Sequence, residues 1–154
     1  MTFLSVNRAA LAATSVAVLL SICASGPLSA ADLGDQVPIE VELTMEGGAE
    51  CQRFVPESLQ LEGGRLYKLR LINRTERSCY FVSNKLADAV YTRKVLVKDS
   101  AGNEAAELYG PLRRAEVKAG ATVEWWLVPV RAGVFDDVAS RRSETGMRAV
   151  ITVK

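Results

Sequence analysis

The sequence contains no histidine among its 154 residues. Histidine is the side chain whose charge ordinarily changes between pH 5 and 8, and it is the commonest metal ligand in proteins. Its absence excludes catalytic triads with an imidazole base, imidazole proton relays and metal centres with imidazole ligands. The serines and threonines of the chain therefore have no evident activating base. The sequence predicts that the protein is not an enzyme.

The chain also lacks an excess of charge of either sign. Arg8 is the only charged residue among the first 31, and without it the basic residues balance the 18 acidic ones. Nucleic acids and anionic membrane surfaces attract proteins that carry a basic excess. We therefore expect neither kind of partner.

The first 31 residues have the composition of an export signal. They contain the apolar run Ala9–Ala24, and Ser29–Ala31 supplies small residues where a signal peptidase cleaves. The run is too short to favour a membrane-spanning helix. The sequence predicts a Sec-type signal peptide over 1–31 and a single domain over 32–154. It also predicts a periplasmic location, with no membrane span after cleavage.

Cysteine is scarce, with three residues in the chain. Cys23 lies in the predicted signal, and a lipoprotein anchor there is disfavoured because Ile22 stands where a small residue is needed. Cys51 and Cys79 remain in the mature domain. In an oxidising compartment, an even pair of cysteines is typical of a disulfide.

Helical patterns are nearly absent, and extended segments are common. In Thr122–Val130, Val123, Trp125 and Leu127 alternate with Glu124, Trp126 and Val128, which is the period of a strand with one face buried. The two tryptophans should therefore point to opposite faces, with one in the core and the other partly covered by the helical segment. That segment is Asn84–Val90, with Asn84 as its expected cap. Other strands are expected near Pro38–Met45, Ser58–Leu61, Leu66–Ile72, Cys79–Val82, Thr92–Lys98, Val134–Val138 and Met147–Lys154.

Several short motifs occur in the order found in one family. The sequence resembles the single-domain, exported cupredoxin-like proteins of bacteria, of the plastocyanin and azurin type. The resemblance implies an all-β fold, a cupredoxin-like antiparallel Greek-key β-sandwich with one short helical insert. It spans nearly all of Pro38–Lys154. The motifs that carry it are Phe54-Val55-Pro56, Leu59-Gln60-Leu61, Tyr67–Asn73, Cys79-Tyr80-Phe81, Gly146-Met147 and Ala149–Val153.

The resemblance also implies where copper ligands would lie. The family's blue-copper site uses a His after the strand that ends in Asn, then a Cys, a His and a Met on the last loop. In this sequence the corresponding positions are Cys79, Asp137, Arg142 and Met147. Three of the four residue types differ, and neither imidazole can be recovered elsewhere in the chain. The type 1 copper site is therefore degenerate.

Two interpretations of the sulfur residues remain open. Cys51 and Cys79 form a disulfide that staples the end of the sandwich where a metal would lie, or they are reduced thiols that hold Cu(I) together with Met147. Soft sulfur ligands suit Cu(I). Met147 is otherwise a packing residue. Asp137 and Arg142 form either an internal ion pair that replaces the metal or two exposed members of a charged loop.

The sequence therefore predicts an exported accessory protein that binds an unknown periplasmic partner. It would belong to a copper- or redox-related system and would have no functional blue-copper site and no resident cofactor. The alternative is a copper-handling protein with a non-standard site made of Cys79 and Met147, with Cys51 as a further ligand.

Overall fold

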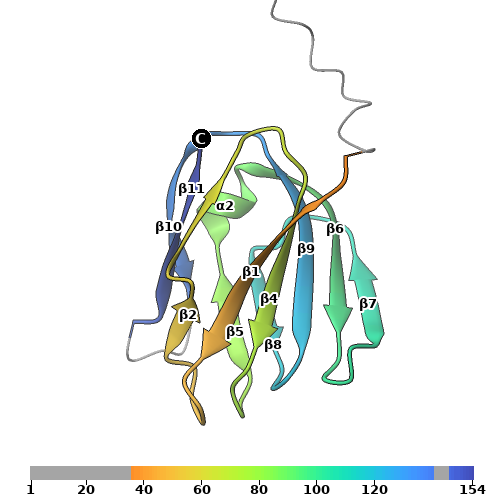
Figure 1. The fold of residues 1–154 in the computed structure, drawn as a ribbon, viewed down its shortest axis with the longest axis vertical. Coiled ribbons are helices and arrows are strands. Elements are labelled where there is room, and N and C mark those ends of the chain that lie inside the picture. Colours follow the sequence, from red (N-terminus) through yellow and green to blue (C-terminus); the bar gives the residue numbers. More distant parts are fainter. Residues whose placement is uncertain (1–35, 141–145) are drawn as a thin grey trace, which may run out of the picture.

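The residues that the structure describes form two facing β-sheets with one short helix (Figure 1). The computed structural model describes residues 36–140 and 146–154, so the predicted signal peptide lies outside the described residues. The all-β sandwich with one short helix predicted from the sequence is confirmed. The elements are β1 (Ile39–Glu46), β2 (Arg53–Val55), β3 (Ser58–Leu61), β4 (Tyr67–Asn73), β5 (Cys79–Val82), α2 (Asn84–Ala87), β6 (Val90–Lys98), β7 (Glu104–Leu108), β8 (Arg114–Val117), β9 (Thr122–Pro129), β10 (Gly133–Ala139) and β11 (Arg148–Val153).

The strands pair in the orders β2-β1-β4-β9-β6-β7 and β3-β11-β10-β5-β8. Most neighbours are antiparallel, as expected, but two pairs are parallel. β1 runs parallel to β4 with Ile39 opposite Tyr67, and β3 runs parallel to β11 with Ser58 opposite Val150. Each parallel pair joins strands that are distant in the sequence, because parallel neighbours need a long crossover.

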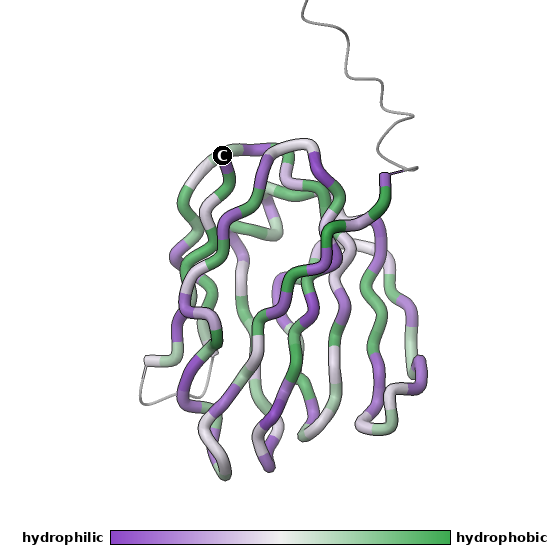
Figure 2. Tube along the Cα trace, viewed as in Figure 1, coloured by the Kyte–Doolittle hydropathy of each residue, from purple (hydrophilic) through white to green (hydrophobic). Residues whose placement is uncertain are grey.

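The core lies between the sheets and follows the alternation seen in the sequence. Buried and half-buried residues alternate along β4, and hydropathy changes in the same way along the strands (Figure 2). Trp125 of β9 is fully buried, and its ring meets Phe81 of β5 edge to face at 6.3 Å between centroids. Its indole Nε1 donates a hydrogen bond to Thr92 Oγ1 at 2.9 Å. This one side chain therefore links both sheets.

Trp126 points to the outer face of the larger sheet, as the alternation predicts. Cationic groups of Lys68, Arg93 and Lys94 lie 5.3–5.9 Å from the centre of its ring. They belong to β4 and β6, the two neighbours of β9, so these strands supply the cover that the structure shows. Long basic side chains can cover an aromatic ring with their apolar stems while their charges stay near water.

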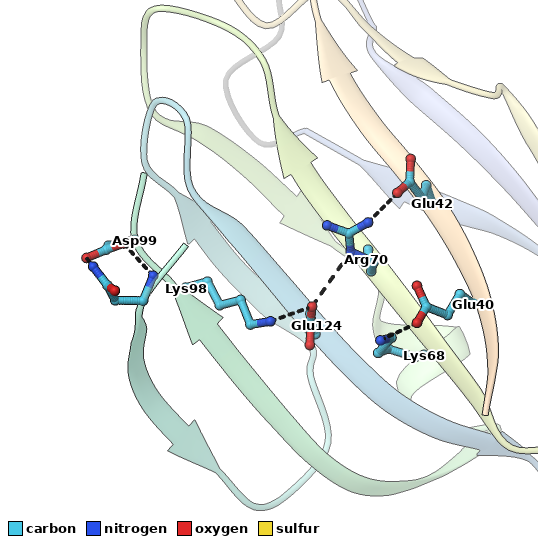
Figure 3. Close-up of polar contacts among 8 residues, drawn as sticks. Glu40, Glu42, Lys68, Arg70, Lys98, Asp99 and Glu124 are labelled. Atoms are coloured by element: carbon cyan, nitrogen blue, oxygen red, sulfur yellow. Dashed lines mark hydrogen bonds and ion pairs between the residues drawn. The ribbon is translucent and has the colours of Figure 1, made fainter. Parts of the chain in front are cut away.

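A ladder of ion pairs crosses the same outer face (Figure 3). Glu42 pairs with Arg70, and Arg70 Nε lies 3.7 Å from Glu124 Oε1. Lys98 Nζ reaches the same Glu124 oxygen at 3.0 Å. The Glu124 side chain is only 5% exposed, so its charge needs both cations. The ladder therefore joins β1, β4, β9 and β6 across the sheet.

The helix is shorter than predicted. It ends at Ala87, and Val90 already belongs to β6. The expected cap at Asn84 is wrong: Asn84 is the first helical residue, Ser83 precedes it, and neither side chain caps the helix. The Lys85 amide instead donates to Asp137 Oδ2 of β10 at 2.7 Å. Among the described residues, no helix combines the length and hydropathy needed to cross a membrane.

The distribution of charged groups predicts how stability depends on pH. Lys68 holds the pKa of Glu40 below its usual 4.5 through a hydrogen bond, and bonds from Asn103 hold the pKa of Asp99 below 3.8. The pKa is also lowered for Asp88, Glu107, Glu116 and Asp136.

A carboxylate whose pKa is lower in the folded state stabilises the fold above its unfolded-state pKa, and this stabilisation is lost as pH falls through the folded-state pKa. With no histidine in the chain, we expect an unfolding midpoint that is nearly constant from about pH 5.5 to 7.5 and falls below about pH 4.5. Thermal unfolding followed by circular dichroism across this range is the measurement. A step in stability centred near pH 6.5 would contradict the prediction.

Candidate functional site

The candidate site lies at the end of the sandwich where β1 and β4 finish and β9 begins (Figure 1). Met45 of β1 stands opposite Asn73 of β4, and Ile72 stands opposite Thr122 of β9. In the other sheet, Cys79 begins β5 opposite Val117, the last residue of β8. The loops 47–52, 74–78 and 118–121 therefore meet at one end of the molecule. The cupredoxin resemblance places the first copper ligand at this end.

A disulfide joins Cys51 to Cys79 at this end. Their Cα atoms are 5.8 Å apart, within the usual range for a disulfide. Cys79 is fully buried, whereas Cys51 is only partly buried and lies against the edge of the core. The bond ties loop 47–52 to the first residue of β5. The disulfide expected from the two cysteines is thus present in the structure.

Asn73 organises the polar part of the site, and it is only 1% exposed. Its Nδ2 donates to the carbonyl oxygens of Arg77 at 2.6 Å and Val117 at 2.8 Å. Its Oδ1 accepts hydrogen bonds from the Thr75 amide at 2.9 Å and the Thr75 hydroxyl at 2.8 Å. Its backbone also pairs with Gly120 and Ala121. Through its side chain and its backbone together, this one residue therefore holds loop 74–78, the end of β8 and loop 118–121 together.

The Thr75 hydroxyl lies next to the disulfide. Thr75 Oγ1 is 3.2 Å from Cys79 Sγ and 3.8 Å from Cys51 Sγ, and Asn73 Oδ1 is 3.4 Å from Cys79 Sγ. The sequence pattern did not predict these roles of Asn73 and Thr75 beside the disulfide. The available clue was an Asn at a strand end with a Thr two residues later, which is the spacing of an Asx turn.

Met147 is 2% exposed and belongs to the same hydrophobic cluster as Cys79. It follows Gly146, whose φ of +71° favours glycine, and its carbonyl accepts a hydrogen bond from the Ser140 amide at 3.1 Å. The side chain thus lies in the core at the start of β11. This position is that of a packing residue, and its ligand role stays a prediction.

Asp137 does not lie beside the disulfide. Ala139 of β10 stands opposite Val82 of β5, so Asp137 and Cys79 extend in opposite directions from that pair. Asp137 Oδ2 accepts the Lys85 amide, and Oδ1 is buried with no hydrogen-bond partner among the described residues. Arg142 lies outside the described residues, so the Asp137–Arg142 ion pair stays a prediction.

The donor set at this end does not fit type 1 copper. That site needs a thiolate and imidazoles, whereas the sulfur of Cys79 is bonded to Cys51 and the sequence has no histidine. Across the described residues, no group of three or more Cys, Asp or Glu side chains is placed to hold a metal ion. At this end of the sandwich, the loops are therefore held together by a disulfide and by hydrogen bonds.

No protein-family model matches the sequence, and no curated protein is significantly similar to it. Solved structures are similar in fold. A multicopper oxidase matches with a TM-score of 0.51 at 13% identity, over 78% of this chain and 44% of the oxidase. Fet3p, a multicopper oxidase that functions in iron import, matches with a TM-score of 0.51 at 8% identity, over 73% of this chain and 27% of Fet3p. The fold is that of a cupredoxin.

The cupredoxin-like chain spans less than half of either oxidase. Auracyanin A, a blue copper protein from Chloroflexus aurantiacus, also matches, with a TM-score of 0.49 at 16% identity over 77% of this chain and 100% of auracyanin A. At these identities the likeness concerns the fold alone. It gives no copper site to this cupredoxin-like chain.

Proposed function

We propose that this protein is an exported, cupredoxin-like accessory protein that binds a periplasmic partner and has no type 1 copper site. The observation that carries the proposal is the disulfide at Cys79, the position of the family's first copper ligand. There, a covalent bond between loop 47–52 and β5 does the cross-linking that a metal does in the blue-copper proteins. The protein would act through contacts in a copper- or redox-related system.

The chemistry of the donors supports this proposal. Type 1 copper is a mixed site of imidazole nitrogens and a thiolate sulfur. A disulfide sulfur is not a thiolate. The polar atoms next to Cys79 Sγ are Thr75 Oγ1 and Asn73 Oδ1, which are hydrogen-bonded to each other. The sequence also offers no basic imidazole for catalysis. Binding is therefore the function class that these residues favour.

A second candidate is Cu(I) handling after reduction of the disulfide. Two observations favour it: the close approach of Cys51 and Cys79, and the burial of the thioether of Met147 in the core. Reduction would release two soft sulfur ligands.

Anaerobic titration with Cu(I) against a competing chelator separates the two candidates. We expect the oxidised protein to leave the chelator fully loaded, and the reduced protein to behave in the same way. Copper binding by the reduced protein that is lost in Cys79→Ser and Met147→Leu would favour copper handling instead. Stoichiometric copper binding by the oxidised protein would contradict the main proposal.

A further inference from the structure

The two sulfurs of the disulfide lie in different surroundings. Cys51 is on loop 47–52 and is partly exposed, between Glu50 and Gln52, which are both exposed. Cys79 is fully buried at the start of β5. Cys51 is therefore the more accessible end of the bond, whereas a thiol from solution would have to enter the core to reach Cys79. Access is one of the factors that decide which sulfur of a disulfide is attacked.

The surroundings of Cys79 also suit a leaving sulfur. The Thr75 hydroxyl donates to Asn73 Oδ1 while the disulfide is intact, and it is 3.2 Å from Cys79 Sγ, so it can turn its hydrogen from that oxygen towards a thiolate there. Once protonated, the same thiol has Asn73 Oδ1 as an acceptor 3.4 Å away. A hydrogen bond to a thiolate lowers the pKa of its conjugate thiol, and a thiol of lower pKa leaves faster in disulfide exchange.

We propose that Cys51 is the exchange site of this disulfide, the sulfur that an external thiol attacks, and that Cys79 is the leaving thiol. The attacking thiolate forms a bond to Cys51 Sγ, the Cys51–Cys79 bond breaks, and its electron pair goes to Cys79 Sγ, which then takes a proton from water. A second thiol of the same partner attacks the mixed disulfide, so the partner dithiol becomes a disulfide and Cys51 is released as a thiolate. Two electrons pass from the partner to the protein.

This inference rests on the proposed function and gives its partner a chemical class, a dithiol protein. It requires no metal. Its test is therefore independent of the copper titration, which decides the proposed function. If the exchange test fails, the result of the copper titration still stands, and the reverse is also true.

The experiment uses the oxidised, exported protein and reduced glutathione as the probe. After a short reaction, acid quenching and alkylation of free thiols, peptide mass spectrometry locates the glutathione. We expect roughly tenfold more glutathione on Cys51 than on Cys79, with Cys79 found alkylated. Equal labelling, or glutathione mainly on Cys79, would overturn the proposal.

Substitutions at Thr75 test the leaving group separately. Thr75→Val removes the hydroxyl and should slow exchange several-fold while glutathione still attaches to Cys51; Thr75→Ser, which keeps a hydroxyl, should restore the rate. Because Thr75→Val also removes a buried hydrogen bond to Asn73, its folding is checked by circular dichroism. If Thr75→Val does not fold, an exchange rate for Thr75→Ser far below that of the unaltered protein would contradict the role of the hydroxyl.

Discussion

Removing the Cys51–Cys79 disulfide should lower the free energy of unfolding by about 3.5 kcal/mol. The bond joins residues 28 positions apart, and in the chain-entropy model a cross-link of this length restricts the unfolded state by that amount. For a domain of this size, the melting temperature should fall by roughly 10–15 °C. Urea unfolding of the Cys51→Ala, Cys79→Ala double variant measures this change together with the cost of the lost side chains.

Reduction of the unaltered protein is the matched control, because it breaks the same bond and leaves both side chains in place. The double variant should lose more stability than the reduced protein, since alanine at the fully buried position 79 also removes core contacts. If reduction leaves the urea midpoint unchanged, the disulfide does not stabilise the loop end. The proposal that it replaces the metal cross-link would then fail.

Asn73→Ala should destabilise the protein by about 3 kcal/mol. The substitution leaves the Arg77 and Val117 carbonyl oxygens without their side-chain donor, and it removes the acceptor of the Thr75 amide and hydroxyl. Buried groups left unpaired in this way carry their full desolvation cost. The free energy of unfolding from urea titration gives the result.

Asn103→Ala is the matched control for Asn73, since it removes the same side chain from an exposed turn. There Asn103 Nδ2 bonds Asp99 Oδ2 at 3.2 Å, and water can replace the lost bond. We expect a much smaller effect, below about 1 kcal/mol. Similar losses for the two variants would show that Asn73 does not organise the loops. Asn73→Ala should also expose Cys79, so its glutathione labelling should become less selective for Cys51.

The sequence was most informative about which faces are buried. Trp125 and Trp126 were assigned to opposite faces because strand side chains alternate, and they lie there. The parallel pairing of β1 with β4 was not foreseen, because a strand with one buried face alternates in the same way in either direction. The cations near the Trp126 ring come from Lys68, Arg93 and Lys94 on neighbouring strands, and the sequence alone does not place those strands side by side.

The candidate site was predicted in part. Cys51 and Cys79 could be paired because the chain is predicted to be exported and only two cysteines remain. The roles of Asn73 and Thr75 depend on carbonyls from residues up to 44 positions away, and such contacts leave no pattern in the local sequence. Asp137 illustrates the same limit. Its partner, the Lys85 amide, is 52 positions away and belongs to a helix of only four residues.

The pairing of β3 with β11 has a consequence for the order in which the protein can fold. β3 lies at the edge of its sheet and has β11 as its neighbour, so Ser58–Leu61 cannot pair until Arg148–Val153 is available. Contacts between such distant segments form slowly because the intervening chain must first be closed into a loop. The smaller sheet is therefore completed late, and until then one edge of β3 stays open to other chains.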